Sequence, residues 1–293
     1  GIITAGTIAL GPAGILVLDA TGGGTGAGGQ IAQTGGSLSG AQLLAQAAAQ
    51  VALNATTFGT IAGSSVGGFD VAGSAGNLTV GTVQGVAGIT ATGAGASVTL
   101  SAAGDLTVGQ SIGAGAGNVL LTAGTGGTGS LTQTGGAISG AGLRAQAADA
   151  VSINSAAITT VAGSAGGAFS VADTSGGLTV GTVQGVSGIT ASGAAPSVTL
   201  STPGDLTVSQ AITAGTGPVA LTTGAGGRLT VNQGVTAGRV AVTADQIAVN
   251  AALGSGATGW TSPPRRRAGT SWSAAAPAAR SSATLATTAP HSP

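Results

Sequence analysis

The sequence predicts an all-β protein, a parallel β-helix (solenoid) with turns of roughly 20 residues, followed by a disordered carboxy-terminal tail. Three observations lead to this fold class: a long internal duplication, apolar residues that alternate with Thr in short segments, and many Gly residues between those segments. The longest shared stretch covers residues 78–108 and returns at residues 178–208 with a few small-residue changes, an offset of 100 residues. Self-similarity at a fixed period is typical of repeat architectures.

The composition supports a thin core of small apolar side chains. The 293 residues include 58 Gly, no Cys and no Met, and only 5% are charged. Such a Gly-rich chain would be disordered if its apolar residues were few, but here they are frequent, β-branched and regularly spaced. The missing Cys excludes disulfides and thiol chemistry. No apolar run approaches the length of a membrane-spanning helix, so the sequence predicts no transmembrane helix.

The duplication divides the chain into a repeat region, residues 1–254, and a tail, residues 255–293. Two full copies cover about residues 30–129 and 130–228, and a partial third copy covers 229–254. The first residues resemble 118–129, so we expect the chain to begin inside a repeat. The tail has no Val or Ile but carries five of the nine Pro and four of the seven Arg. We expect it to be disordered, and one hypothesis is that it is read out of frame.

Each copy contains triplets of the Leu-Thr-Val kind, in which two apolar residues flank Thr. This period-2 pattern predicts half-buried strands separated by turns of Gly, Ser and Asn. Residues 41–53 contain strong helix formers, but the apolar positions that they share with residues 141–153 are all odd-numbered. We therefore predict a strand there as well.

The spacing of the strands suggests how the chain coils. Val98 follows Leu78, and Val119 follows Val98, at the interval of roughly one turn, so about five turns would make one copy. Each turn would bury its apolar face by stacking on its neighbours. Asn54 and its equivalents Asn154 and Asn250 follow apolar strands, and each is interpreted either as a left-handed corner or as an ordinary turn residue.

No catalytic, cofactor-binding or metal-binding residues are predicted. The only His, His291, lies in the tail, and there is no cluster of metal ligands. Asp105 and Asp205 are repeat equivalents, which five intervening turns would keep apart. Asp70 and Asp173 are expected in loop-like positions without a second acid nearby, as solvated turn residues.

Other motifs are also interpreted as structural. The Gly-rich residues 22–29 are not followed by the Lys of a phosphate loop. The basic triplet 265–267, between Trp260 and Trp272, is expected to be solvated charge, so we expect no nucleic-acid partner. The outward Thr residues recur at unequal intervals along the sequence. That irregularity argues against a flat, lattice-matched ice-binding face.

Two stretches, residues 104–124 (GDLTVGQSIGAGAGNVLLTAG) and 129–158 (GSLTQTGGAISGAGLRAQAADAVSINSAAI), resemble filamentous-haemagglutinin-type repeats. These repeats occur in large bacterial exoproteins exported by two-partner secretion. The resemblance covers most of residues 1–254 and implies a right-handed parallel β-helix. It also implies an outer-membrane transporter as partner and adhesion at the bacterial cell surface. The sequence lacks the secretion domain that such a transporter recognises.

The leading functional interpretation is therefore a non-enzymatic fragment of a secreted or cell-surface adhesin. Its partners would be receptors or glycans on host or neighbouring cells, and it would need no cofactor. Two alternatives remain open at this point: a carbohydrate-processing β-helix enzyme, and a purely structural surface-layer or biofilm-matrix protein.

Overall fold

The computed structural model describes residues 1–22, 29–254 and 271–275, and every regular element in these residues is a β-strand. The predicted all-β fold class is confirmed. The chain divides into two compact units, Gly1–Ala150 and Val151–Pro293, which are described separately below.

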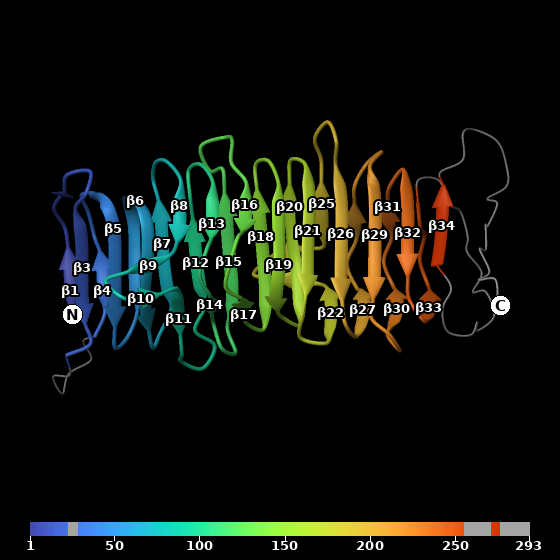
Figure 1. Ribbon diagram of the computed structural model, residues 1–293, viewed down its shortest axis with the longest axis horizontal. Helices are drawn as coiled ribbons and strands as arrows, with labels where there is room; N and C mark the ends of the chain where they lie inside the picture. The colour runs from blue at the N-terminus through green and yellow to red at the C-terminus, as the bar shows by residue number, and fades with distance from the viewer. Residues whose placement is uncertain (23–28, 255–270, 276–293) are drawn as a thin grey trace. The chain divides into compact units, whose positions relative to one another are not determined.

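The first unit contains eighteen described strands, drawn from blue to green in Figure 1. They are β1 (Ile2–Thr4), β2 (Ile8–Ala9), β3 (Ile15–Ala20), β4 (Ile31–Gln33), β5 (Leu38–Ala47), β6 (Val51–Ser65), β7 (Phe69–Gly73), β8 (Leu78–Val80), β9 (Thr82–Val83), β10 (Val86–Ala87), β11 (Ile89–Ala91), β12 (Val98–Ser101), β13 (Leu106–Val108), β14 (Ile112–Gly113), β15 (Asn118–Ala123), β16 (Leu131–Gln133), β17 (Ile138–Ser139) and β18 (Gly142–Ala147).

The second unit contains the remaining sixteen described strands. They are β19 (Val151–Ala157), β20 (Thr160–Ala165), β21 (Ala168–Asp173), β22 (Gly177–Val180), β23 (Thr182–Val183), β24 (Val186–Ser187), β25 (Ile189–Ala191), β26 (Ser197–Thr202), β27 (Asp205–Val208), β28 (Ile212–Thr213), β29 (Pro218–Thr223), β30 (Arg228–Val231), β31 (Val235–Thr236), β32 (Arg239–Thr243), β33 (Gln246–Val249) and β34 (Ser271–Ala275).

Parallel ladders hold the first unit together. One ladder joins β1, β4, β6, β7, β12, β15 and β18 in that order. A second joins β8, β13 and β16, and a third joins β11, β14 and β17. Because the chain returns to each ladder once per turn, each turn is one coil of a parallel β-helix.

The second unit repeats this pattern with an offset of 100 residues. Its ladders join β19, β21, β26, β29 and β32; β20, β22, β27, β30 and β33; and β20, β25, β28 and β31. Phe69 is paired with Val98 in the first unit, and Phe169 with Val198 in the second. The duplicated sequence thus forms the same local structure in both units.

The coils are less uniform than the sequence suggested. Val98 pairs with Phe69 on one side and with Val119 on the other, whereas Leu78 pairs with Leu106. The expected interval of one turn from Leu78 to Val98 is therefore wrong, whereas that from Val98 to Val119 is confirmed. The coil that contains Leu78 is long because it includes the short antiparallel hairpin β9–β10 between its strands β8 and β11.

The expected five turns per copy are also wrong. Ile31 lies in the first ladder of the first unit, whereas its repeat equivalent Leu131 lies in the second ladder. Starting from Ile31, the first ladder passes through Val51, Phe69, Val98 and Val119 before the chain reaches Leu131. One copy therefore consists of four complete coils plus the strand of one further face. As a result, Ile31 and its repeat equivalent Leu131 lie on different faces of the coil.

The core is a column of inward-facing aliphatic and aromatic side chains. Phe69, Val98 and Val119 are fully buried and stack on one another in register. Residues 41–47 lie in β5 and residues 51–53 in β6, so strand rather than helix is confirmed, although a corner at residues 48–50 divides the stretch into two strands. Stacked small side chains fill the narrow interior and remove apolar surface from water, which stabilises the coil.

Gln33, in the repeated Gln-Thr-Gly-Gly motif, holds a corner between two coils. Its side chain is buried, and Oε1 accepts hydrogen bonds from the amides of Asn54 and Ala55, both at 3.1 Å. Its Nε2 donates to the carbonyls of Gly36 and Ala55 at 3.0 and 3.3 Å. Gln133 donates to Gly136 in the same way. The motif is thus explained by its role in satisfying backbone groups at the corner.

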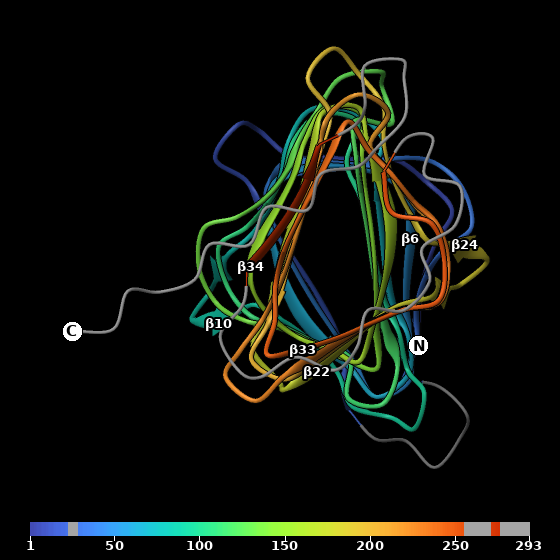
Figure 2. The ribbon, with the colours of Figure 1, turned by 90° about the vertical axis from the view of Figure 1, so that its right-hand side faces the viewer.

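The left-handed conformation considered for Asn54, Asn154 and Asn250 is wrong. Among the described non-Gly residues, positive φ angles occur at Gln84 (50°) and Gln184 (48°). Both lie in two-residue turns, Gln84 joining β9 to β10 and Gln184 joining β23 to β24. In Figure 2 the β23–β24 hairpin, labelled at β24, projects from the coils of its unit.

The expected disordered tail lies mostly outside the described residues. Its described part, residues 271–275, forms β34, which pairs antiparallel with β32. The expected disorder is therefore wrong for these five residues. In the part of the chain that the structure describes, no helix is long and apolar enough to span a membrane.

Candidate functional site

The outer faces of the coils carry rows of hydroxyl groups. In the first unit, strand pairing places Thr60, Thr79, Thr107 and Thr132 opposite one another on four successive coils. All four side chains are partly exposed and alternate with buried residues of the same strands. Neighbouring strands lie about 4.8 Å apart, so the hydroxyl groups recur at that distance along the row.

The second unit has the equivalent row, formed by Thr160, Thr179, Thr207 and Thr230. A further row there is formed by Ser164, Thr190, Thr213 and Thr236, which belong to β20, β25, β28 and β31.

These rows correct the expectation based on sequence spacing. The intervals from Thr60 to Thr79, Thr107 and Thr132 are unequal along the chain, yet the ladder places all four in register. The extra residues lie in the β9–β10 hairpin and in the corners, outside the ladder. The regularity of the row is therefore a property of strand pairing and not of the distance along the sequence.

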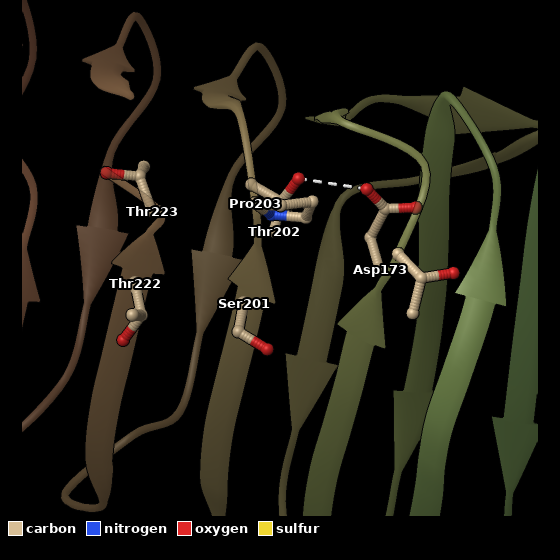
Figure 3. Close-up of a pocket in the computed structure, with 8 residues that line it drawn as sticks. Asp173, Ser201, Thr202, Pro203, Thr222 and Thr223 are labelled. Atoms are coloured by element: carbon tan, nitrogen blue, oxygen red, sulfur yellow. Dashed lines mark hydrogen bonds between the residues drawn. The ribbon is translucent and has the colours of Figure 1, made fainter. Parts of the chain in front are cut away.

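The second unit also has a shallow hollow of about 440 Å³ where strands β21, β26 and β29 end, shown in Figure 3. It is lined by Asp173, Thr174, Ser201, Thr202, Pro203, Thr222, Thr223 and Gly224. Ser201, Thr222 and Thr243 are aligned by strand pairing, so the hollow lies beside another short row of hydroxyl groups.

Asp173 is the acidic residue of this hollow, and its side chain is only 5% exposed. Oδ1 accepts hydrogen bonds from the amides of Ile158 and Ser175, at 3.3 and 3.2 Å, and from the Ser175 hydroxyl at 2.7 Å. Oδ2 accepts from the amide of Gly176 at 3.3 Å and from the Thr202 hydroxyl at 2.9 Å. Five donors occupy the acceptor positions of this carboxylate, so it stabilises the corner between coils.

The equivalent place in the first unit has no such cluster. Its residues are Gly73, Ala102, Ala103 and Ala123 where the second unit has Asp173, Thr202, Pro203 and Thr223. Ala102 and Ala123 are buried, as are Thr202 and Thr223. The acid and the hydroxyl that donates to it are thus present together in one unit and absent together from the other.

The other repeat-region aspartates considered from the sequence, Asp105 and Asp205, also bind backbone groups. Asn77 accepts a hydrogen bond from the Asp105 amide at 2.9 Å, and the Asp105 carboxylate accepts one from the Ser130 amide at 2.8 Å. Asp205 accepts from the Arg228 amide at 2.8 Å. These side chains bind amides of the next coil and so join neighbouring coils, instead of capping their own turns.

The expected loop-like positions of Asp70 and Asp173 are wrong, because Asp70 lies within β7 and Asp173 ends β21. Asp70 is exposed as a residue, but the sheet partly desolvates its carboxyl group and so raises its pKa. No group of three or more potential metal ligands occurs among the described residues. His291, Trp260 and residues 265–267 lie outside the described residues, and Trp272 belongs to β34.

Sequence reasoning missed the hydroxyl rows and the Asp173 cluster. The rows could have been found only with the register, because their members are separated by unequal intervals. A signal for the cluster was present: the two copies differ at several small residues that become polar together in the second copy.

We compared the chain with models of known protein families, with curated protein sequences and with solved structures, and none of them matches it.

Proposed function

We propose that this chain is a structural and adhesive segment of a bacterial secreted or cell-surface adhesin, without enzymatic activity. It would attach to host or neighbouring cells through an extended β-helical surface. The observation that supports this proposal best is the pair of four-membered Thr rows, Thr60 to Thr132 and Thr160 to Thr230.

Such rows suit extended contact better than chemistry in a pocket. A row of equally spaced, uncharged hydroxyl groups presents the same donors and acceptors at every coil. A long hydroxyl-rich partner, such as a cell-surface glycan, can exchange hydrogen bonds with several coils at once. Each such contact contributes little by itself, so the attachment would depend on the number of coils engaged.

The resemblance to filamentous-haemagglutinin repeats supports the extracellular location and the route by which the chain would arrive there. We propose export through an outer-membrane transporter of the two-partner secretion type. This part of the proposal rests on the sequence pattern of residues 104–124 and 129–158.

The test is attachment of the purified chain to bacterial cells, host cells and immobilised glycans. Replacing Thr79 and Thr107 by Val, together with Thr179 and Thr207, removes four row hydroxyls and keeps the β-branched shape. We expect binding to fall several-fold in this variant.

Thr99→Val provides the control, because Thr99 is outward-facing and neither of its ladder neighbours, Asp70 and Leu120, carries a hydroxyl group. Binding should be retained in the control. If the unmodified chain binds neither cells nor glycans, the adhesive function is wrong and a purely structural matrix role is favoured.

A further inference from the structure

The hollow at the ends of β21, β26 and β29 has a volume suited to a small ligand. Its volume of about 440 Å³ falls within the range of small-molecule sites, about 300–1,000 Å³. All of its lining residues belong to the second unit. Because the hollow is shallow, it suits one ring of a longer molecule better than a small molecule that must be enclosed on all sides.

The floor of the hollow is held in place by hydrogen bonds within the protein. The Thr202 hydroxyl donates to Asp173, and the Thr223 hydroxyl donates to the Gly227 carbonyl at 3.3 Å. Asp173, Thr202 and Thr223 are 5%, 4% and 6% exposed. These side chains therefore support the hollow instead of binding a ligand directly.

Two hydroxyl groups at the rim are available to a ligand. Ser201 of β26 and Thr222 of β29 are directly opposite each other in the ladder, about 4.8 Å apart. Thr222 is exposed and Ser201 is partly exposed, and neither hydroxyl has a hydrogen-bond partner in the described part of the chain. Each hydroxyl can both donate and accept. The rim thus offers a pair of matched hydrogen-bonding groups.

An apolar surface lies beside this pair. Pro203 is exposed, and Figure 3 shows it beyond the end of the strand that carries Ser201. The hydroxyl pair also occurs in the first copy, as Ser101 and Thr122, but there Ala103 replaces the proline. Five lining positions differ between the copies, and at each the second copy has the larger side chain; they are positions 173, 174, 202, 203 and 223. The second copy thus adds a floor and an apolar wall around an unchanged pair of hydroxyls.

The charge of the hollow favours an uncharged ligand. No Arg is among the described residues that line it, and the chain has no Lys. An anion would therefore be repelled by the Asp173 carboxylate without a cation to bind it. A metal ion would need the carboxylate oxygens of Asp173, which already accept five hydrogen bonds.

We propose that this hollow binds one ring of a neutral, hydroxyl-rich glycan. Two hydroxyls of the sugar would pair with Ser201 and Thr222, and its apolar face would pack on Pro203. The glycan would continue toward Thr243, the next member of the row. This inference rests on the proposed adhesive function and names the class of glycan bound. A single ring would bind weakly, and attachment would depend on several such contacts.

The probes are three neutral sugars, methyl α-glucoside, methyl α-mannoside and methyl β-galactoside, and their binding to the full chain is measured by saturation-transfer difference NMR. We expect saturable binding of at least one of them. Ser201→Ala combined with Thr222→Val should weaken it by about tenfold or more, because two hydrogen bonds are lost. Pro203→Ala, which restores the residue of the first copy, should weaken it several-fold and replaces the double variant if circular dichroism shows that the latter is unfolded. Glucuronic acid, the anionic probe, should bind more weakly than the neutral sugar.

Ser101→Ala combined with Thr122→Val is the matched control, since these residues form the same pair in the first unit. Binding of the sugar should be retained in this control and in the variant that lacks four hydroxyls of the Thr rows. The proposal is overturned if none of the three sugars binds saturably, if the control weakens binding as much as the hollow variant, or if glucuronic acid binds as tightly.

Failure of this inference can be distinguished from failure of the proposed function. If the chain attaches to cells but binds none of the sugars, the hollow is not a glycan site and the adhesive function stands. If the sugars bind at the hollow but the chain attaches to no cells, the adhesive function is wrong and the hollow remains a sugar site.

Discussion

The Asp173 carboxylate accepts a 2.9 Å hydrogen bond from the Thr202 hydroxyl, and both groups are buried where two strands of the second unit end (Figure 3). Their equivalents in the first unit, Gly73 and Ala102, carry neither an acid nor a hydroxyl group. The corner is thus built differently in the two units: it contains small apolar residues in the first unit and an acid surrounded by hydrogen-bond donors in the second.

This relationship predicts strong coupling between the two residues. Thr202→Ala removes one donor to a buried carboxylate and should lower the free energy of unfolding by about 1–3 kcal/mol. Asp173→Gly should cost more, because it leaves the Thr202 hydroxyl and the amides of Ile158, Ser175 and Gly176 without their acceptor. The double variant restores the pair found in the first unit, so its cost should be about 1–2 kcal/mol below the sum. Urea denaturation followed by circular dichroism measures all three, and additive costs would contradict the coupling.

The buried corner glutamine gives a second prediction. Gln33→Ala removes the partner of two amides and two carbonyls, so it should destabilise the first unit by roughly 2–4 kcal/mol. Gln84→Ala serves as the control, since Gln84 is exposed at a hairpin turn. Thermal denaturation of the two variants should differ clearly. Equal melting temperatures would mean that Gln33 does not hold the corner.

The hairpin turns predict a stabilising change. Gln84 adopts a φ of 50° and is followed by Gly85 with a φ of 82°. Asn tolerates the left-handed region better than Gln, and Asn-Gly is a favoured two-residue hairpin turn. Gln84→Asn should therefore raise the free energy of unfolding by up to about 1 kcal/mol. Gln84→Val, which is β-branched, should lower it, and the reverse order in thermal melts would refute this assignment.

Asp70 predicts a pH dependence. Desolvation raises its pKa in the folded state, so the folded protein holds this proton at pH values where the unfolded chain has lost it. As pH rises from the ordinary Asp pKa through the raised one, Asp70 therefore reduces the stability of the folded state. Asp70→Ser introduces the residue found at position 170 and should raise the melting temperature at pH 7, with little effect near pH 3. A benefit that is equal at both pH values would contradict the desolvation of Asp70.

The sequence was sufficient to predict the fold class and the inward faces of the strands, because period-2 alternation is a local signal. Val80 and Leu106 are buried and Thr79 is partly exposed, as their alternation predicts. The pairing of Leu78 with Leu106 could not be predicted, because the residues of the β9–β10 hairpin count along the chain but lie outside the ladder. The Thr rows could not be predicted for the same reason.

The Asp173 cluster could not be predicted for a different reason. Its donors come from β26, from the residue after β19 and from the corner after β21, which are distant from one another in sequence. Only the register of the coils brings Thr202 to Asp173. A residue that appears in sequence as a lone turn aspartate is therefore a buried, fully bonded side chain.

The register of the coils is tested most directly by cross-linking, because the chain has no cysteine of its own. Thr79 and Thr107 are opposite each other on neighbouring strands, so cysteines at both positions should form a disulfide under mild oxidation. Cysteines in place of Thr79 and Thr99, whose spacing matches the turn length expected from sequence, lie on different ladders. We predict efficient cross-linking for the first pair and none for the second, measured by the shift of the oxidised chain in non-reducing electrophoresis. Efficient cross-linking of the second pair, without that of the first, would contradict this register and the Thr rows that depend on it.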